Sequence, residues 1–387
     1  MYSFVNFTQG ATFAQCLYCL LLYCFLLLFS LRGNVSNLFI KADLKGGRIF
    51  LFCGLLLFAL TAFVGADFFH YYEFMSEYRG QVFGDQELGL ESFYQYLINY
   101  IDGNYFIFRL VVWGGSLALI VTATRLFGAN VYHTLFVILA GFIVTYSYAR
   151  ATLAMSVFSL GIVIICTANK HKKGIIKTII GIAIVACSIY FHRSMLPMIV
   201  VAACWLLLPC KKQLSRYSLL LFPIIVVIVS NILKIVFAEV IDMVGMIDDE
   251  SGFLQKTEYY VEQETVDVNT NGIIRLVFHY ANFYLPFLIL GKVFSEKTAL
   301  QNISSECVKL YQIVYLIYAF ATSFLFLGVG SSVFFDRYLY MSFIPLSILI
   351  TYMKDSGVLS NKRYLWIVTC FILCNFLQLF AYVYAER

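Results

Sequence analysis

Long apolar stretches recur along the whole chain, and short polar segments separate them. Each stretch approaches the roughly 20 apolar residues that a helix needs to cross a bilayer. The pattern predicts a single integral membrane domain over residues 1–387, an all-α polytopic fold with about twelve transmembrane helices. The predicted spans are 11–31, 49–66, 106–124, 131–148, 150–168, 175–191, 195–209, 217–237, 273–291, 310–327, 337–352 and 364–384.

Two polar segments, 67–105 and 238–272, are longer than the other connections and hold 16 of the 22 acidic residues. Within the first, LESFYQYLINYI places Phe93, Leu97 and Tyr100 at helical spacing. This spacing predicts an amphipathic helix in the membrane interface, where aromatic side chains are favoured.

Lysine and arginine are distributed differently between the two sides of the membrane. Alternate connections hold 13 of the 15 lysines, so the positive-inside rule makes these connections cytoplasmic and the two long acidic loops outward-facing. Five of the 12 arginines lie instead where a span meets the outer face. They are Arg109, Arg150, Arg193, Arg275 and Arg337.

Taken singly, each of these arginines is better explained as a headgroup anchor or as the partner of a loop carboxylate. Five on one side favour a site for an anionic ligand, since ionisable groups at membrane depth are costly. A guanidinium also binds phosphate through two parallel hydrogen bonds, which a lysine ammonium cannot do.

The composition narrows the class of protein further. The chain is 61% hydrophobic and 13% charged, with a mean hydropathy of +0.83, which is typical of a membrane protein. No basic run is interleaved with aromatic residues in a polar segment, so we expect no nucleic-acid partner. The eleven cysteines avoid the two long loops and form no Cys-x-x-Cys pair with two histidines, so we expect no metal site and no cofactor.

From about residue 50 to residue 350, short motifs follow one another in a characteristic order. They are Asp67 with Tyr71, the run Glu91-Ser92-Phe93-Tyr94, Arg150 with Leu153 and Ala154, His192 with Ser194, and Arg337-Tyr338. In this order the chain resembles the EpsG-like branch of the Wzy-type polysaccharide polymerases. That branch usually has Arg-Gln at the fifth span, whereas here Ala151 follows Arg150.

The resemblance implies a GT-C-like polymerase in the bacterial inner membrane, with an active site that faces the periplasm or exterior. Its substrates would be oligosaccharide repeats on undecaprenyl diphosphate, joined into an O-antigen, capsule or exopolysaccharide. Membrane lipids, a chain-length regulator and a flippase are the partners it suggests.

We assign roles to residues on this basis. His192 is the expected base for the acceptor hydroxyl, because its cationic neighbour Arg193 favours the neutral imidazole. Asp67 and Glu91 would position sugar hydroxyls, and either could instead be the base. The five outer arginines would bind the diphosphate, and Tyr71, Tyr94 and Tyr338 would contact sugars.

Two other classes fit a chain of this kind. One is a lipid-linked-sugar glycosyltransferase or ligase that uses the same arginines on a different acceptor. The other is a polysaccharide transporter or flippase, which should carry polar residues near the bilayer midplane in broken helices of related halves. The five prolines, the absence of an internal repeat and the charge at one membrane edge favour an enzyme.

The predicted topology can be tested in intact cells. A cysteine introduced near Glu262 should react with a membrane-impermeant thiol reagent, and one introduced near Lys172 should not, because only the acidic loops face outward. Reversed labelling would place the five arginines at the cytoplasmic face and would contradict the predicted site.

Overall fold

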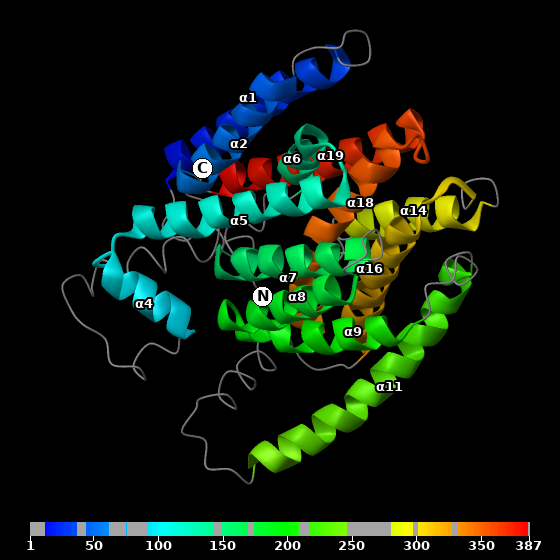
Figure 1. Ribbon diagram of the computed structural model, residues 1–387. Coiled ribbons are helices and arrows are strands. Elements are labelled where there is room, and N and C mark those ends of the chain that lie inside the picture. Colours follow the sequence, from blue (N-terminus) through cyan, green and yellow to red (C-terminus); the bar gives the residue numbers. More distant parts are fainter. Residues whose placement is uncertain are drawn as a thin grey trace. The chain divides into compact units, whose positions relative to one another are not determined.

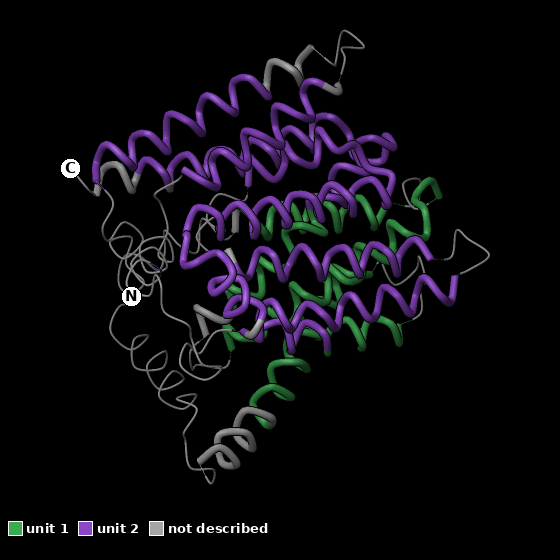
Figure 2. The backbone as a smooth tube through the Cα atoms, turned by 60° about the vertical axis from the view of Figure 1, so that its left-hand side comes forward, with its two compact units in different colours: residues 1, 200–346 green, residues 2–199, 347–387 purple. Residues whose placement is uncertain are grey.

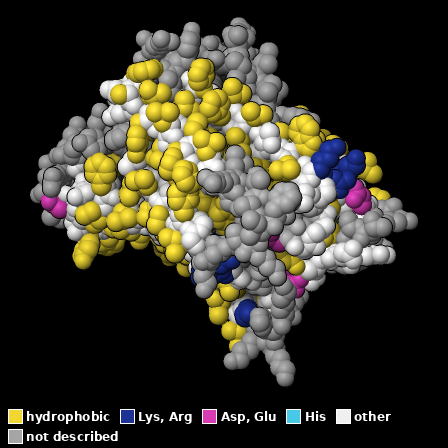
Figure 3. Space-filling view, turned by 90° about the horizontal axis from the view of Figure 1, so that it is seen from above, with side chains coloured by type: hydrophobic (Ala, Val, Ile, Leu, Met, Phe, Trp, Pro, Cys, Tyr) yellow, Lys and Arg dark blue, Asp and Glu magenta, His cyan; other side chains and the backbone are white. Residues whose placement is uncertain are grey.

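The structure is a computed structural model that describes residues 12–36, 44–61, 75, 91–141, 149–168, 174–208, 217–245, 280–296, 301–326 and 331–385. Within these ranges every regular element is a helix (Figure 1). Five of the described helices are long and apolar enough to cross a membrane, and further apolar helices are shorter. Figure 3 shows hydrophobic side chains over most of the described surface on one face. The chain is a multi-pass membrane protein.

Helices occur at all of the predicted spans. Over the first half of the chain they are α1 (Phe13–Ser36), α2 (Leu44–Thr61), α5 (Tyr105–Phe127), α6 (Val131–Gly141), α7 (Ala149–Thr167) and α8 (Gly174–Cys187). Over the second half they are α9 (Leu196–Leu207), α11 (Ser218–Gly245), α14 (Leu285–Ser295), α16 (Ser305–Ser323), α17 (Ser331–Met341), α18 (Phe343–Asp355) and α19 (Asn361–Ala385). The total of about twelve transmembrane helices stays a prediction.

The predicted span 337–352 is not one helix. It is divided between α17 and α18 by a turn at Ser342, whose hydroxyl donates a hydrogen bond to the carbonyl of Leu339 at 2.6 Å. A serine hydroxyl that bonds to its own backbone competes with the helical ladder, which accounts for a break inside an apolar stretch.

The described residues fall into two compact units, drawn in different colours in Figure 2. Unit 1 comprises residues 1 and 200–346, and unit 2 comprises residues 2–199 and 347–387. Each unit is described by itself below.

In unit 2, α5, α7 and α8 run side by side (Figure 1). The contact between α7 and α8 depends on two glycines. A Cβ on Gly161 would lie 2.8 Å from the carbonyl oxygen of Gly181, and a Cβ on Gly181 would lie 2.9 Å from that of Gly161. The two backbones are therefore in direct contact, as small residues permit between membrane helices.

A second group of unit 2 helices, α1, α2, α6 and α19, is joined by buried polar contacts. The Tyr132 hydroxyl donates to the carbonyl of Ser30 at 2.7 Å, and the Asn375 amide donates to the carbonyl of Ala140 at 2.8 Å. These bonds satisfy polar groups that would otherwise be buried without a partner, a requirement that is strict in an apolar surrounding.

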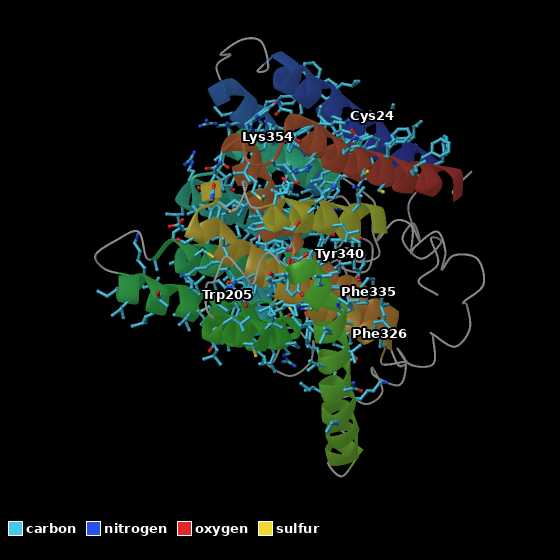
Figure 4. All side chains as sticks on the ribbon, turned by 90° about the vertical axis from the view of Figure 1, so that its right-hand side faces the viewer. Cys24, Trp205, Phe326, Phe335, Tyr340 and Lys354 are labelled. Atoms are coloured by element: carbon cyan, nitrogen blue, oxygen red, sulfur yellow. The ribbon has the colours of Figure 1, made fainter. Side chains whose placement is uncertain are left out.

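Unit 1 is built around α16, which packs against α11 and α17. The Tyr284 and Thr322 hydroxyls lie 2.6 Å apart, and Tyr318 donates to the carbonyl of Phe283 at 3.1 Å. Residues Tyr280–Tyr284 form a short π-helix before α14. The Phe283 ring contacts Tyr340 and the Tyr284 ring stacks on Phe335, and both partners belong to α17 (Figure 4). Aromatic rings and hydroxyls thus form much of this unit's interior.

The glycine contact between α7 and α8 leads to a stability prediction. Gly161→Ala should destabilise the protein by roughly 1–3 kcal/mol, because the added methyl group overlaps the backbone of α8. The measurement is the melting temperature of the purified protein in detergent. The control is Gly114→Ala on α5, where no heavy atom lies within 4 Å of the new Cβ, and it should be neutral or stabilising. Equal effects of the two substitutions would contradict the close contact.

Candidate active site

Glu91 lies at the N-terminal end of α4 (Ser92–Tyr100), an amphipathic helix at the predicted position. Tyr94 and Ile98 face inward and are buried, whereas Tyr96 and Tyr100 are exposed. Of the residues predicted to share one side of this helix, Phe93 and Leu97 are half-buried and Tyr100 is exposed, and the buried face is the neighbouring one that begins at Glu91.

A tight turn fixes α4 against the start of α5. Asp102 and Gly103 both have positive φ values, of 51° and 64°, which reverse the chain direction within a few residues. Asn104 then begins α5, and its side chain accepts a hydrogen bond from the backbone N–H of Ile107 at 3.1 Å. The Tyr94 and Phe108 rings lie 5.8 Å apart across this turn, so α4 is held at the end of α5.

The carboxylate of Glu91 binds three groups from two distant segments. Its Oε2 accepts a hydrogen bond from Arg150 Nη1 at 2.7 Å. Its Oε1 lies 2.9 Å from His192 Nδ1 and accepts a hydrogen bond from the backbone N–H of Arg193 at 3.1 Å. The Glu91 side chain is only 7% exposed, so it is a buried anion with three donors around it.

These contacts determine the ionisation of Glu91. Burial alone would raise its pKa, but the hydrogen bond from His192 and the positive charges of Arg150 and His192 together outweigh burial. They lower the pKa of Glu91 from its ordinary 4.5 to about 2. Glu91 is therefore ionised at neutral pH and is a weak base.

Arg150 lies in the first turn of α7, and its position is fixed from both sides. The Tyr94 hydroxyl donates to the Arg150 carbonyl at 3.1 Å, and the guanidinium carbon lies 5.9 Å from the centre of the Tyr94 ring. The small buried residues Ala151 and Ala154 follow on the helix and are consistent with the close packing of α7 against α5. Arg150 is thus positioned by its backbone, its ring contact and the Glu91 carboxylate.

His192 is the extended residue between two short 3-10 helices, Ser188–Tyr190 and Arg193–Met195. Its backbone N–H donates to the Ser188 carbonyl at 3.2 Å, and its own carbonyl accepts from Met195 N–H at 3.0 Å. Phe191, the residue before it, makes an edge contact with Phe93 of α4 at 4.8 Å. This turn brings the imidazole to Glu91 across 101 residues of sequence.

The arrangement has a direct chemical consequence for the imidazole. A neutral His192 that donates its Nδ1–H to Glu91 carries the acceptor lone pair on Nε2. A carboxylate in this position also stabilises the imidazolium that forms when Nε2 takes up a proton. The cluster of Glu91, Arg150, His192 and Arg193, here called the Glu91 cluster, can therefore remove a proton and present positive charge at one place.

A family model described as EpsG family matches residues 47–386, nearly the whole chain. The chain belongs to the EpsG family. This is a family of Wzy-like polysaccharide polymerases, which confirms the resemblance and supports a role of the polysaccharide-polymerase type. No curated protein and no solved structure matches the chain.

The remaining predicted site residues of this EpsG protein have varied surroundings. Arg109 is 1% exposed on α5, with its guanidinium 5.8 Å from the centre of the Tyr105 ring. Arg337 and Tyr338 lie in unit 1 on α17, where Tyr338 is buried against Phe324. Asp67, Tyr71 and Arg275 lie outside the described residues. In the described part of the chain, no three His, Cys, Asp or Glu side chains are grouped to hold a metal ion.

The surroundings of two residues bear on the roles assigned to them from the sequence. Tyr94 is fully buried, so its ring and hydroxyl support Arg150 and present no face to a sugar. Both oxygens of Glu91 contact protein donors, which orients His192 and Arg150, and its role toward a sugar hydroxyl stays a prediction. The sequence also gave no sign that the backbone N–H of Arg193 would be one of these donors.

The low pKa of Glu91 gives the EpsG protein a specific response to acid. Because the folded pKa lies below the ordinary 4.5, the stability that Glu91 contributes is fully present above about pH 5. It is lost as pH falls toward 2. Glu91→Gln should therefore lower the melting temperature at pH 7, and its difference from the native protein should shrink between about pH 5 and pH 3.

The control for this measurement is Tyr94→Phe, which removes a neighbouring hydroxyl without changing any charge. Its effect on the melting temperature should stay constant over the same pH range. A Glu91→Gln deficit that is as large at pH 3 as at pH 7 would show that the carboxylate is not ionised in the folded protein.

Proposed function

We propose that this EpsG protein joins undecaprenyl-diphosphate-linked oligosaccharide repeats into a surface polysaccharide by glycosyl transfer at the Glu91 cluster. The observation that carries the proposal is the meeting of a histidine, two arginines and a buried carboxylate at one point. They come from three segments of the chain, because Arg150 lies 59 residues after Glu91 and His192 lies 101 residues after it.

The acceptor sugar hydroxyl approaches Nε2 of His192, which removes its proton. The hydroxyl oxygen forms a bond to the anomeric carbon of the donor sugar, and the bond between that carbon and the diphosphate oxygen breaks. The diphosphate leaves with the electron pair of the broken bond and remains on its polyprenyl tail. The imidazolium, stabilised by Glu91, then returns its proton to solvent.

The arginines act on the leaving group. Negative charge builds on the diphosphate as the glycosidic bond breaks, and fixed positive groups at that point stabilise the transition state more than the ground state. Arg193 is exposed, so its guanidinium can reach a lipid diphosphate, while Glu91 binds both the Arg150 guanidinium and the backbone N–H of Arg193. Arg109 is buried and presents no open face to this ligand, and the roles of Arg275 and Arg337 stay predictions from the sequence.

The position of the cluster supports a lipid-linked substrate. It lies at the start of the membrane helix α7 and beside α4, whose exposed Tyr96 and Tyr100 are typical of a helix in the membrane interface. A diphosphate on a polyprenyl tail occupies this same level of the bilayer. The positive-inside rule assigns it to the outer face of the bacterial inner membrane.

The test uses purified protein in lipid nanodiscs with lipid-linked repeats as substrate. His192→Gln should lower the rate of polymer formation by about 100-fold or more, because proton removal typically contributes that much. Arg193→Lys, which keeps the charge but loses the guanidinium fork, should lower it by roughly tenfold to 100-fold. Arg363→Lys at the start of α19 is the matched control and should polymerise normally.

The result of this test distinguishes three ways in which the proposal could fail. If His192→Gln forms polymer at the native rate, the imidazole is not the base. If the native protein moves lipid-linked repeats across the bilayer without joining them, the protein is a transporter and the proposal is wrong. If it transfers a repeat only to a different acceptor, it is a ligase.

A further inference from the structure

A cavity of about 490 Å³ lies in unit 2 at the end of α5. It is lined by Arg48 of α2, Arg125 of α5, Asp355 of α18 and the turn of residues 128–131. The 23 residues of α5 extend roughly 34 Å at 1.5 Å per residue, and the Glu91 cluster lies at the other end of this helix. The cavity and the cluster are thus separated by about the thickness of a bilayer.

The turn that lines the cavity is rigidly built. Gly128 ends α5 in the left-handed conformation, with φ of 88°, and its N–H bonds to the carbonyls of Thr124 and Arg125. The Asn130 side chain then accepts a hydrogen bond from the backbone N–H of Tyr132 at 2.9 Å. The cavity wall is therefore fixed by backbone geometry.

The single carboxylate in the wall makes its contacts within the protein. Asp355 Oδ1 lies 2.9 Å from His133 Nδ1, and Oδ2 accepts a hydrogen bond from the backbone N–H of Asn130 at 2.9 Å. Lys354, labelled in Figure 4, lies behind this pair with its ammonium 3.1 Å from His133 Nε2. Asp355 thus uses its oxygens on His133 and Asn130, and within the described ranges it makes no ion pair with Arg48 or Arg125.

Arg48 is held at the cavity by close packing of its helix. A Cβ on its neighbour Gly47 would lie 3.0 Å from the Tyr132 ring, so α2 is in contact with α6 here. The Nε of Arg48 is buried and has no hydrogen-bond partner in the part of the chain that the structure describes. Arg125 is exposed. Within the same ranges, no salt bridge joins either guanidinium to a carboxylate.

Both arginines border surface that faces lipid in a membrane protein. Ile49, next to Arg48, is 66% exposed, and Leu126, next to Arg125, is 48% exposed. On α1 and α2, the rings of Phe25, Phe29 and Phe50 form a cluster with centroids 4.6 to 6.5 Å apart, and Phe50 follows Arg48 by two residues. Apolar surface suited to an acyl chain therefore begins next to Arg48.

We propose that this cavity binds the phosphate of an anionic glycerophospholipid through Arg48 and Arg125. The guanidinium groups match the oxygens of a phosphate, and a basic cavity between membrane helices on the lysine-rich side is suited to such a headgroup. The volume exceeds that of a lone phosphate ion and leaves room for the glycerol part of the lipid. The lipid would anchor α2, α5 and α18 to one another at the side of the membrane opposite to the Glu91 cluster.

The test measures lipid binding by native mass spectrometry of the full-length protein released from detergent. The probes are phosphatidylglycerol, phosphatidylcholine, inorganic phosphate and glycerol 3-phosphate. Native protein should retain phosphatidylglycerol in preference to phosphatidylcholine. Arg48→Gln and Arg125→Gln should each weaken this binding by about tenfold, since each removes a charge-assisted contact. Lys362→Gln removes an exposed cation outside the cavity and should leave binding unchanged.

Because Arg125 is exposed, Arg125→Gln should fold normally and carries the test even if Arg48→Gln does not fold. Equal retention of phosphatidylglycerol by native protein and Arg125→Gln overturns the proposal. Displacement of the lipid by millimolar inorganic phosphate or glycerol 3-phosphate assigns the cavity to a soluble anion and overturns the lipid as its source. Preferential retention that depends on both arginines and resists soluble phosphate supports it.

Discussion

The carboxylate of Glu91 is the group on which the candidate active site depends. A buried anion is unfavourable unless several donors surround it, and here the donors are the guanidinium of Arg150, the imidazole of His192 and a backbone N–H. Removing the carboxylate would leave a half-buried cation without its anion and an imidazole without this contact. One side chain thus decides the position of two groups that our account assigns to chemistry.

Packing between the helices of unit 2 holds these donors in position around Glu91. Arg150 begins α7, which packs against α5 on one side and, through the contact of Gly161 with Gly181, against α8 on the other. The turn that carries His192 follows α8 directly, and α4 is tied to the start of α5. The three segments of the site therefore meet at the start of α7 and the end of α8, and a shift of either helix would separate Glu91 from its partners.

Much of the fold could be predicted from the sequence, because membrane helices are signalled by long apolar runs alone. The break at Ser342 could not, since an average over an apolar window does not register a single hydroxyl that bonds to its own backbone. At the site, the sequence singled out Glu91, Arg150, His192 and Arg193 by residue type and position. Their pairing was hidden because contacts across 59 and 101 residues depend on helix packing, which local patterns do not encode.

The same limit applies to the surroundings of Tyr94 and Glu91. An aromatic residue and an acid in an outward loop are expected to meet water and sugar, and only the packing of α4 on α5 shows that both are buried. The cavity lined by Arg48 and Arg125 could not be predicted from the sequence either, because the helices that line it come from distant parts of the chain.

The most direct test of the account is a double-mutant cycle on the rate of polymer formation with Glu91→Gln, His192→Gln and the two combined. If Glu91 acts by orienting His192, Glu91→Gln should slow the His192→Gln variant far less than it slows the native protein, and the remaining effect should come through Arg150. If the two effects multiply instead, Glu91 and His192 act independently, and the buried carboxylate is not the centre of the site.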